Sequence, residues 1–163
     1  MTTINLSLDE IYNLSKEVLE FNGCDEKSSS AVANTVCTAE RDGSASHGLF
    51  RIPGYVKSLK SKKVNGKANP TINNLTQNAI RVDGDHGFAP VAINVGIPAL
   101  VEITKKHGIG VLTITNTHHF AALWPETEAL AEENLVGIAC TAYKPSVAPA
   151  GAKKPLFGTN PIS

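Results

Sequence analysis

The sequence lacks net charge, long apolar runs and a leader segment. Lysine plus arginine and aspartate plus glutamate both number 15, so the formal net charge of the 163 residues is zero. This balance excludes a general electrostatic attraction to nucleic acid or to an acidic membrane. The most apolar stretch, residues 87–101, is too short for a bilayer span, and residues 1–10 lack the basic and apolar parts of a signal peptide. We therefore expect a soluble cytoplasmic protein without nucleic-acid or membrane partners.

Cysteine is scarce, and its spacing excludes a disulfide framework. The three cysteines, Cys24, Cys37 and Cys140, are odd in number and form neither a CxxC pair nor a dense pattern. Such cysteines are typical of reduced, buried thiols in a cytosolic protein.

Metal-ligand spacing is absent as well. His118 and His119 are adjacent, so on a strand their side chains would face opposite ways. Asp83, Asp85 and His86 form a polar turn that matches no recognised ligand spacing. We predict no metal site.

The first third of the chain has helical patterns. Ser7 and Glu10 form a capping box before a first helix, and Asp25 opens a second helix that ends near residue 43. Residues 49–59 predict a third helix, interrupted at Pro53.

Strands and helices alternate after that. The expected elements are two strands at 71–76 and 79–82, a helix at 89–106 kinked by Pro98, a strand at 110–115, a helix at 125–134 and a strand at 136–141. The strand–helix–strand run over 110–141 predicts a parallel pair joined by a right-handed crossover. The fold class is therefore mixed α/β, with a helical segment over residues 1–68 and an α/β portion over 69–163.

The C-terminal residues predict an incomplete fold. Residues 156–162 begin another apolar, strand-like run, and Ser163 follows directly with no helix or polar tail to close the core. We expect the sequence to be the front part of a longer polypeptide.

Glycines near residue 108 do not form a dinucleotide-binding motif. Gly108 and Gly110 follow a predicted helix and precede a predicted strand. A phosphate-binding loop needs the reverse order, because the phosphate lies at a helix N-terminus. We predict a helix C-cap at this point and no Rossmann site.

Two polar clusters are candidates for chemistry. In the first, a helix beginning near Ser46 would place His47, Arg51 and Tyr55 on one face, joining a titratable imidazole to a guanidinium that can grip a carboxylate. The alternative is a serine N-cap followed by surface polar residues. The second cluster, residues 116–120, directly follows the 110–115 strand, where open α/β sheets bind ligands, or else forms a turn with a capping histidine.

Together these segments resemble one family. The chain is similar to the type-2 malate/lactate dehydrogenase family of NAD(P)-dependent oxidoreductases through Ser46-His47-Gly48 with Arg51 and Tyr55, the loop Asn116-Thr-His-His-Phe120, and Gly158-Thr-Asn-Pro161. These segments stand in family order and at about family spacing across essentially the whole chain. Residues 118–125 (HHFAALWP) and 154–162 (KPLFGTNPI) are most similar to the branch that reduces cyclic ketimine acids.

The resemblance implies a site and a cofactor. Family members bind a nicotinamide cofactor, NADPH or NADH, in a non-Rossmann fold, and they are homodimers about twice this length. By position, His47 and His119 are the alternative proton donors, and Arg51 is the carboxylate anchor beside Ser46 and Tyr55. The expected cofactor-binding residues are Asn116, Tyr143, Thr159 and Asn160.

The resemblance therefore predicts hydride transfer to a small cyclic ketimine carboxylate, piperideine- or pyrroline-2-carboxylate. Phe120, Leu123 and Trp124 are either an apolar wall for the substrate ring or ordinary core. Two other functions stay open. One is a malate/L-lactate-type 2-hydroxy-acid dehydrogenase, and the other is a binding or scaffold module without catalysis.

Overall fold

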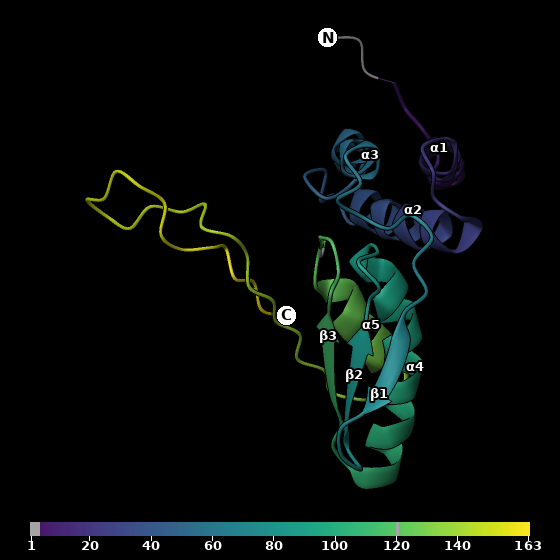
Figure 1. Cartoon of the computed structure of the whole chain (residues 1–163), viewed down its shortest axis with the longest axis vertical. Coiled ribbons are helices and arrows are strands. Elements are labelled where there is room, and N and C mark those ends of the chain that lie inside the picture. The colour runs from purple at the N-terminus through teal and green to yellow at the C-terminus, as the bar shows by residue number, and fades with distance from the viewer. Residues whose placement is uncertain (1–3, 120) are drawn as a thin grey trace. The chain divides into compact units, whose positions relative to one another are not determined.

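The structure is a computed structural model that describes residues 4–119 and 121–163. It is mixed α/β, as predicted, and it divides into two units, Met1–Ala122 and Leu123–Ser163. The first unit holds four of the five α-helices found among the described residues and all three strands (Figure 1). Each unit is described by itself.

Two capped helices begin the first unit. α1 spans Leu8–Phe21 and α2 spans Glu26–Arg41. The Ser7 hydroxyl accepts the Glu10 N–H at 3.2 Å, and the Glu10 carboxylate accepts the Ser7 N–H at 2.7 Å. The Asp25 carboxylate accepts the Ser28 N–H at 2.8 Å. Both predicted helix starts are therefore confirmed, because each side chain satisfies an N–H group that the first helical turn leaves unpaired.

The third helix differs from its prediction. A 3₁₀ turn over Leu49–Arg51 leads into α3, which spans Ile52–Lys60. Pro53 does not interrupt this helix, because it lies in the first turn, where no intrahelical partner exists for a backbone N–H. The core of this helical layer is formed by apolar side chains of α1, α2 and α3 together with two from the start of α4: Ile11, Leu19, Val32, Val36, Ile52, Tyr55, Phe88 and Val91.

A three-stranded sheet follows in the order β1-β2-β3. β1 (Thr71–Asn74) pairs antiparallel with β2 (Ala79–Asp83), and β2 pairs parallel with β3 (Val111–Thr115). The helix α4 (Ala89–His107) connects the two parallel strands and packs on the sheet (Figure 1). At Gly96 a Cβ atom would lie 2.8 Å from the end of the Leu112 side chain, so the glycine lets α4 approach the sheet closely without displacing that side chain.

The observed bounds of α4 are close to the predicted helix at 89–106. The helix is continuous through Pro98, and Gly108 ends it with φ 80°, which confirms the predicted glycine C-cap. Its last turn carries Lys105, Lys106 and His107. Within the described parts of the chain, no helix combines the length and the apolar character that a membrane crossing requires.

The second unit corrects two strand predictions. It begins with α5 (Trp124–Glu132), but residues 136–141 and 156–162 form isolated bridges, Cys140 with Ile162 and Val147 with Phe157, rather than strands. The expected crossover over 110–141 is therefore wrong, and the parallel pair is β2–α4–β3. Periodicity identifies an extended apolar segment, but pairing decides whether that segment becomes a strand.

Candidate functional site

The candidate site lies in the first unit, where two loops meet the start of α3. We name residues 44–51 the Ser46 loop and residues 116–119 the His118 loop. The Ser46 loop joins α2 to α3, and the His118 loop follows β3. Tyr55 links the two, because its hydroxyl oxygen lies 3.3 Å from Nδ1 of His119.

Short hydrogen bonds hold the Ser46 loop together. The His47 N–H donates to the Ser44 carbonyl at 2.8 Å. Nδ1 of His47 lies 2.9 Å from the Ser46 hydroxyl and 3.2 Å from the Ser44 hydroxyl. Two hydroxyls therefore orient the imidazole ring. Sequence reasoning missed Ser44, although a hydroxyl three residues before a histidine in a turn is a usable signal.

Arg51 is anchored at one end of its guanidinium. Its Nε–H donates to the Ser46 carbonyl at 2.6 Å. Within the described residues, the two terminal nitrogens have no hydrogen-bond or ion-pair partner, and the side chain is only half-buried. A guanidinium fixed in this way presents a fork of donors, which suits a carboxylate.

The proximity of His47 and Arg51 has a different cause from the one predicted. Helix α3 begins at Ile52, so His47 lies in a turn before the helix and the three residues do not share a helical face. The hydrogen bond from Arg51 to Ser46 brings the two side chains together instead. The predicted helical geometry is therefore wrong, and the assignment of these three residues to the site stays a prediction.

The His118 loop is fastened to the start of α4. The His118 N–H donates to the Gly87 carbonyl at 2.7 Å, and the His118 carbonyl accepts the Ala89 N–H at 3.2 Å. The Asn116 amide donates to the Asp83 carboxylate at 2.8 Å. Asn116, predicted to bind cofactor, thus has its side chain engaged within the fold.

His119 has an unusual backbone and an aromatic neighbour. Its φ of 53° is left-handed, a region that histidine occupies more readily than most residues and that clusters at functional sites. Its ring makes an edge contact with the Tyr55 ring at 5.5 Å, and Tyr55 makes another with Phe88 at 5.2 Å. Because Tyr55 is only 6% exposed, it contacts His119 from the core side. Nothing in the local sequence signals Phe88, which supports both Tyr55 and His118.

Burial and positive charge keep these imidazoles neutral. Burial, and then the Arg51 charge, lower the pKa of His47 below its usual value. The same two causes, with smaller effects from His118 and His47, lower the pKa of His119 to about 4. Burial raises the pKa of Tyr55 to about 12. Tyr55 therefore keeps its proton and can donate to Nδ1 of His119, which leaves the histidine proton on Nε2.

The remaining predicted cofactor residues lie in the second unit. The Asn160 side chain accepts the Tyr143 N–H at 2.9 Å, and Asn160 has φ 42°. Gly158 lies against the Tyr143 carbonyl, where a Cβ atom would clash. The structure thus places Tyr143 beside residues 158–160, while Asn116 belongs to the first unit. Phe120 of the expected apolar wall lies outside the described residues.

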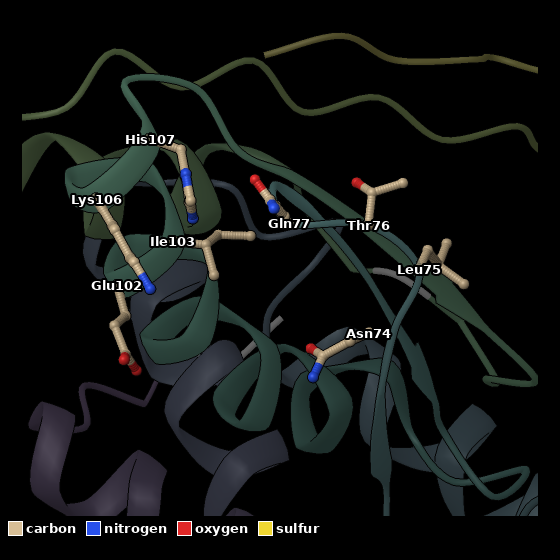
Figure 2. A pocket seen from close by; sticks show the side chains of 8 residues that line it. All are labelled: Asn74, Leu75, Thr76, Gln77, Glu102, Ile103, Lys106 and His107. Carbon is tan, nitrogen blue, oxygen red and sulfur yellow. The ribbon is translucent and has the colours of Figure 1, made fainter.

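A hollow of about 670 Å³ opens at the other end of the sheet. β1 runs antiparallel to β2, so its last residue lies near the start of β2, whereas the His118 loop follows the end of β3. The hollow is lined by both polar and apolar side chains. Its lining includes no cluster of hydrogen-bonded histidines, so we do not place the active site there. Figure 2 shows its lining side chains, which come from the β1–β2 hairpin and the last turns of α4: Asn74, Leu75, Thr76, Gln77, Glu102, Ile103, Lys106 and His107.

The sequence is similar to one protein family and to several named reductases. The chain matches the family described as malate/L-lactate dehydrogenase over residues 6–163. It is 44% identical over 158 residues to delta(1)-pyrroline-2-carboxylate reductase 2 of Burkholderia multivorans, which covers 97% of this chain and 46% of that protein. It is 42% identical over 162 residues to the delta(1)-pyrroline-2-carboxylate/delta(1)-piperideine-2-carboxylate reductase of Pseudomonas putida, covering 99% of this chain and 48% of the relative.

Solved structures agree. The crystal structure of delta1-piperideine-2-carboxylate reductase from Pseudomonas syringae pvar. tomato superposes with a TM-score of 0.90 at 39% identity, covering 98% of this chain and 48% of that one. Malate dehydrogenase from Entamoeba histolytica also gives 0.90, at 31% identity, over 99% and 45% of the two chains. The chain thus spans about half the length of the curated relatives it matches. On its sequence and its fold, the chain belongs to the malate/L-lactate dehydrogenase family.

Proposed function

We propose that the full-length protein is an NAD(P)H-dependent reductase of a small cyclic ketimine carboxylate, piperideine- or pyrroline-2-carboxylate. One observation carries the proposal. Two imidazoles with lowered pKa values lie within electrostatic reach of an arginine whose terminal nitrogens have no hydrogen-bond or ion-pair partner among the described residues. The relatives named for these substrates support the substrate class.

Arg51 would bind the substrate carboxylate. Its Nε–H is held by Ser46, so the terminal nitrogens keep a fixed direction and can donate two parallel hydrogen bonds. A carboxylate gripped at two points fixes the plane of the adjacent C=N bond. This orientation is the main contribution that a positioning residue makes to hydride transfer.

The neutral histidines suit a protonated ketimine. A ketimine is most reactive toward hydride when its nitrogen carries a proton, because an iminium is the better electrophile. A neutral imidazole can accept a hydrogen bond from that N–H⁺ group, whereas an imidazolium would repel it. His47, whose Nδ1 lies beside the Ser44 and Ser46 hydroxyls, is then the acceptor and proton relay, whereas His119, which accepts from the Tyr55 hydroxyl at Nδ1, would present its Nε2–H as a donor.

The cofactor would be NADPH or NADH, which supplies the hydride when bound. In the second unit, the Tyr143 side chain is 41% exposed and offers a flat ring for stacking, beside the Asn160 amide. We assign the cofactor contacts to Tyr143, Thr159 and Asn160. A non-Rossmann binding mode is supported by Gly108, which caps α4 ahead of β3 rather than opening a helix.

The proposal extends to the whole protein. The family resemblance supports a homodimer, and the free thiols of Cys24, Cys37 and Cys140 are compatible with a reducing cytoplasm. The helix–sheet arrangement of the described chain would then be the front part of a longer fold, since it matches just under half of the relatives' length.

A substrate comparison tests the function. We expect the full-length enzyme with reduced cofactor to show a higher kcat/KM for a cyclic ketimine carboxylate than for pyruvate or oxaloacetate. The likeness to a malate dehydrogenase makes a 2-hydroxy-acid dehydrogenase the second candidate. A preference of more than about tenfold for either keto acid, about 1.4 kcal/mol in transition-state binding, would favour that candidate. Lack of turnover with all three compounds would leave a binding module.

A further inference from the structure

A carboxylate on α2 supports the loop that carries Arg51. Glu40 lies in the last turn of α2, and its Oε1 accepts the backbone N–H of Leu49 at 2.7 Å. Leu49 is the first residue of the 3₁₀ turn that ends at Arg51. The bond joins two residues nine positions apart, so it fixes the Ser46 loop to a helix rather than to itself.

Gly48 makes room for this carboxylate. A Cβ atom at Gly48 would overlap both Oε1 and Cδ of Glu40, because the glycine is buried against that side chain. A side chain at this position would force the Glu40 carboxylate away from the Leu49 N–H.

The same turn then sets the position of Arg51. The Arg51 N–H donates to the Gly48 carbonyl at 2.9 Å, and its Nε–H donates to the Ser46 carbonyl at 2.6 Å. Both carbonyls belong to the loop that Glu40 holds. A displacement of Leu49 and Gly48 therefore moves the acceptors that aim the guanidinium.

We propose that Glu40 is a positioning residue, which acts through the Leu49 N–H and the space left by Gly48 to aim Arg51 at the substrate carboxylate. This inference rests on the proposed function, because it takes Arg51 as the carboxylate anchor. The required property of Glu40 is a hydrogen-bond acceptor at Oε1, not its negative charge. An amide at this position can still accept from Leu49.

The experiment uses three variants of the full-length enzyme. Glu40→Ala removes the acceptor, Glu40→Gln keeps it, and Gly48→Ala leaves the carboxylate but displaces it. We expect KM for the ketimine carboxylate to rise about tenfold in Glu40→Ala and in Gly48→Ala, with kcat within about twofold of the parent. Glu40→Gln should stay within about twofold of the parent in both constants. Glu17→Ala, an exposed glutamate of α1, is the matched control.

Two readouts separate this inference from the substrate assignment. Hydrogen exchange at the Leu49 amide should be about tenfold faster in Glu40→Ala and unchanged in Glu40→Gln. The dissociation constant for pyridine-2-carboxylate, a planar ring acid, should rise about tenfold in Glu40→Ala and in Gly48→Ala, even if the parent reduces no ketimine.

The following results overturn the inference. Glu40→Ala or Gly48→Ala could change KM and the dissociation constant no more than Glu17→Ala does. Glu40→Gln could also raise KM and the dissociation constant as much as Glu40→Ala does, which would mean that the charge of Glu40 rather than its acceptor oxygen matters. If Glu40→Ala does not fold, Gly48→Ala decides the question by the same criteria. If the parent shows no ketimine turnover, the proposed function is wrong. The positioning role of Glu40 still stands in that case if Leu49 exchange and pyridine-2-carboxylate binding change in the variants as expected.

Discussion

The guanidinium of Arg51 is held at one edge and open at the other. Its Nε–H donates to the Ser46 carbonyl, while its charge lowers the pKa of both His47 and His119. One side chain therefore offers donors for an anionic group and helps keep the neighbouring imidazoles neutral.

Replacing Arg51 should weaken substrate binding more than it slows chemistry. In the full-length enzyme, we expect Arg51→Met to lower kcat/KM by a factor that corresponds to about 3 kcal/mol of transition-state stabilisation. Most of the change should appear in KM, because the variant loses a charge-assisted two-point contact. Steady-state kinetics with a ketimine carboxylate measure the effect. Lys57→Met, at an exposed cation on α3, is the matched control. An unchanged KM in Arg51→Met would remove Arg51 from the substrate site.

Short sequence motifs named residues that lie near one another in the structure, but they did not predict which contacts those residues make. His47, Arg51 and His119 were all named from short motifs, and the structure brings them within electrostatic reach of one another. The link between Tyr55 and His119 spans 64 residues of sequence, so no local pattern could reveal it. The same holds for Glu40, whose bond to Leu49 depends on how α2 ends beside the loop.

The His118 loop is the element that couples the sheet to the candidate site. It is bonded to Gly87 and Ala89 at the start of α4, and it carries His119 against Tyr55. A proton on His119 would be placed in a part-buried position beside the Arg51 charge. The stability of this element should therefore depend on pH.

The sign of that dependence follows from the lowered pKa. Above pH 6.5, His119 is neutral in both the folded and the unfolded state, so it contributes no pH dependence. Below pH 6.5 the unfolded state takes up a proton that the folded state resists down to about pH 4, so the free energy of unfolding falls. After allowance for solvent screening of this part-exposed ring, we expect a loss of about 1–2 kcal/mol between pH 7.5 and pH 4.5.

Urea unfolding of the full-length enzyme at the two pH values measures this loss. His119→Gln should reduce the loss, because glutamine does not titrate. His107→Gln, at an exposed histidine in the last turn of α4, serves as the control and should leave the loss in place. An equal reduction in both variants would show that the loss does not arise at His119.

Element prediction succeeded where local rules decide the outcome. The capping box at Ser7, the cap at Asp25 and the left-handed Gly108 all lie where the residue types place them. It failed for residues 136–141, whose alternating apolar pattern is that of a strand. A strand needs a continuous ladder of hydrogen bonds, and among the described residues this segment pairs only at its end, where residues 139–141 bond with residues 161–163 around the bridge from Cys140 to Ile162.

At the scale of the whole molecule, the second unit has exposed apolar side chains on one extended segment and its bridge partner. Val136 is 99% exposed, Ile138 is 82% exposed and Ile162 is 77% exposed. The alternate residues are half-buried, and at Gly137 a Cβ atom would meet the Leu130 side chain of α5. One face of this extended segment is therefore covered, and the other presents an apolar stripe.

Such an exposed apolar stripe favours self-association. We expect the 163-residue chain, made by itself, to associate in a concentration-dependent manner, and its thermal transition to be broad. The double variant Ile138→Thr/Ile162→Thr should shift sedimentation-velocity profiles toward the monomer. It makes two exposed side chains shorter and polar while it keeps the branch at Cβ. Phe21→Ser is the matched control, since Phe21 is 91% exposed but lies at the end of α1 in the first unit. If Phe21→Ser abolishes association and the double variant does not, the first unit, not the apolar stripe, drives it.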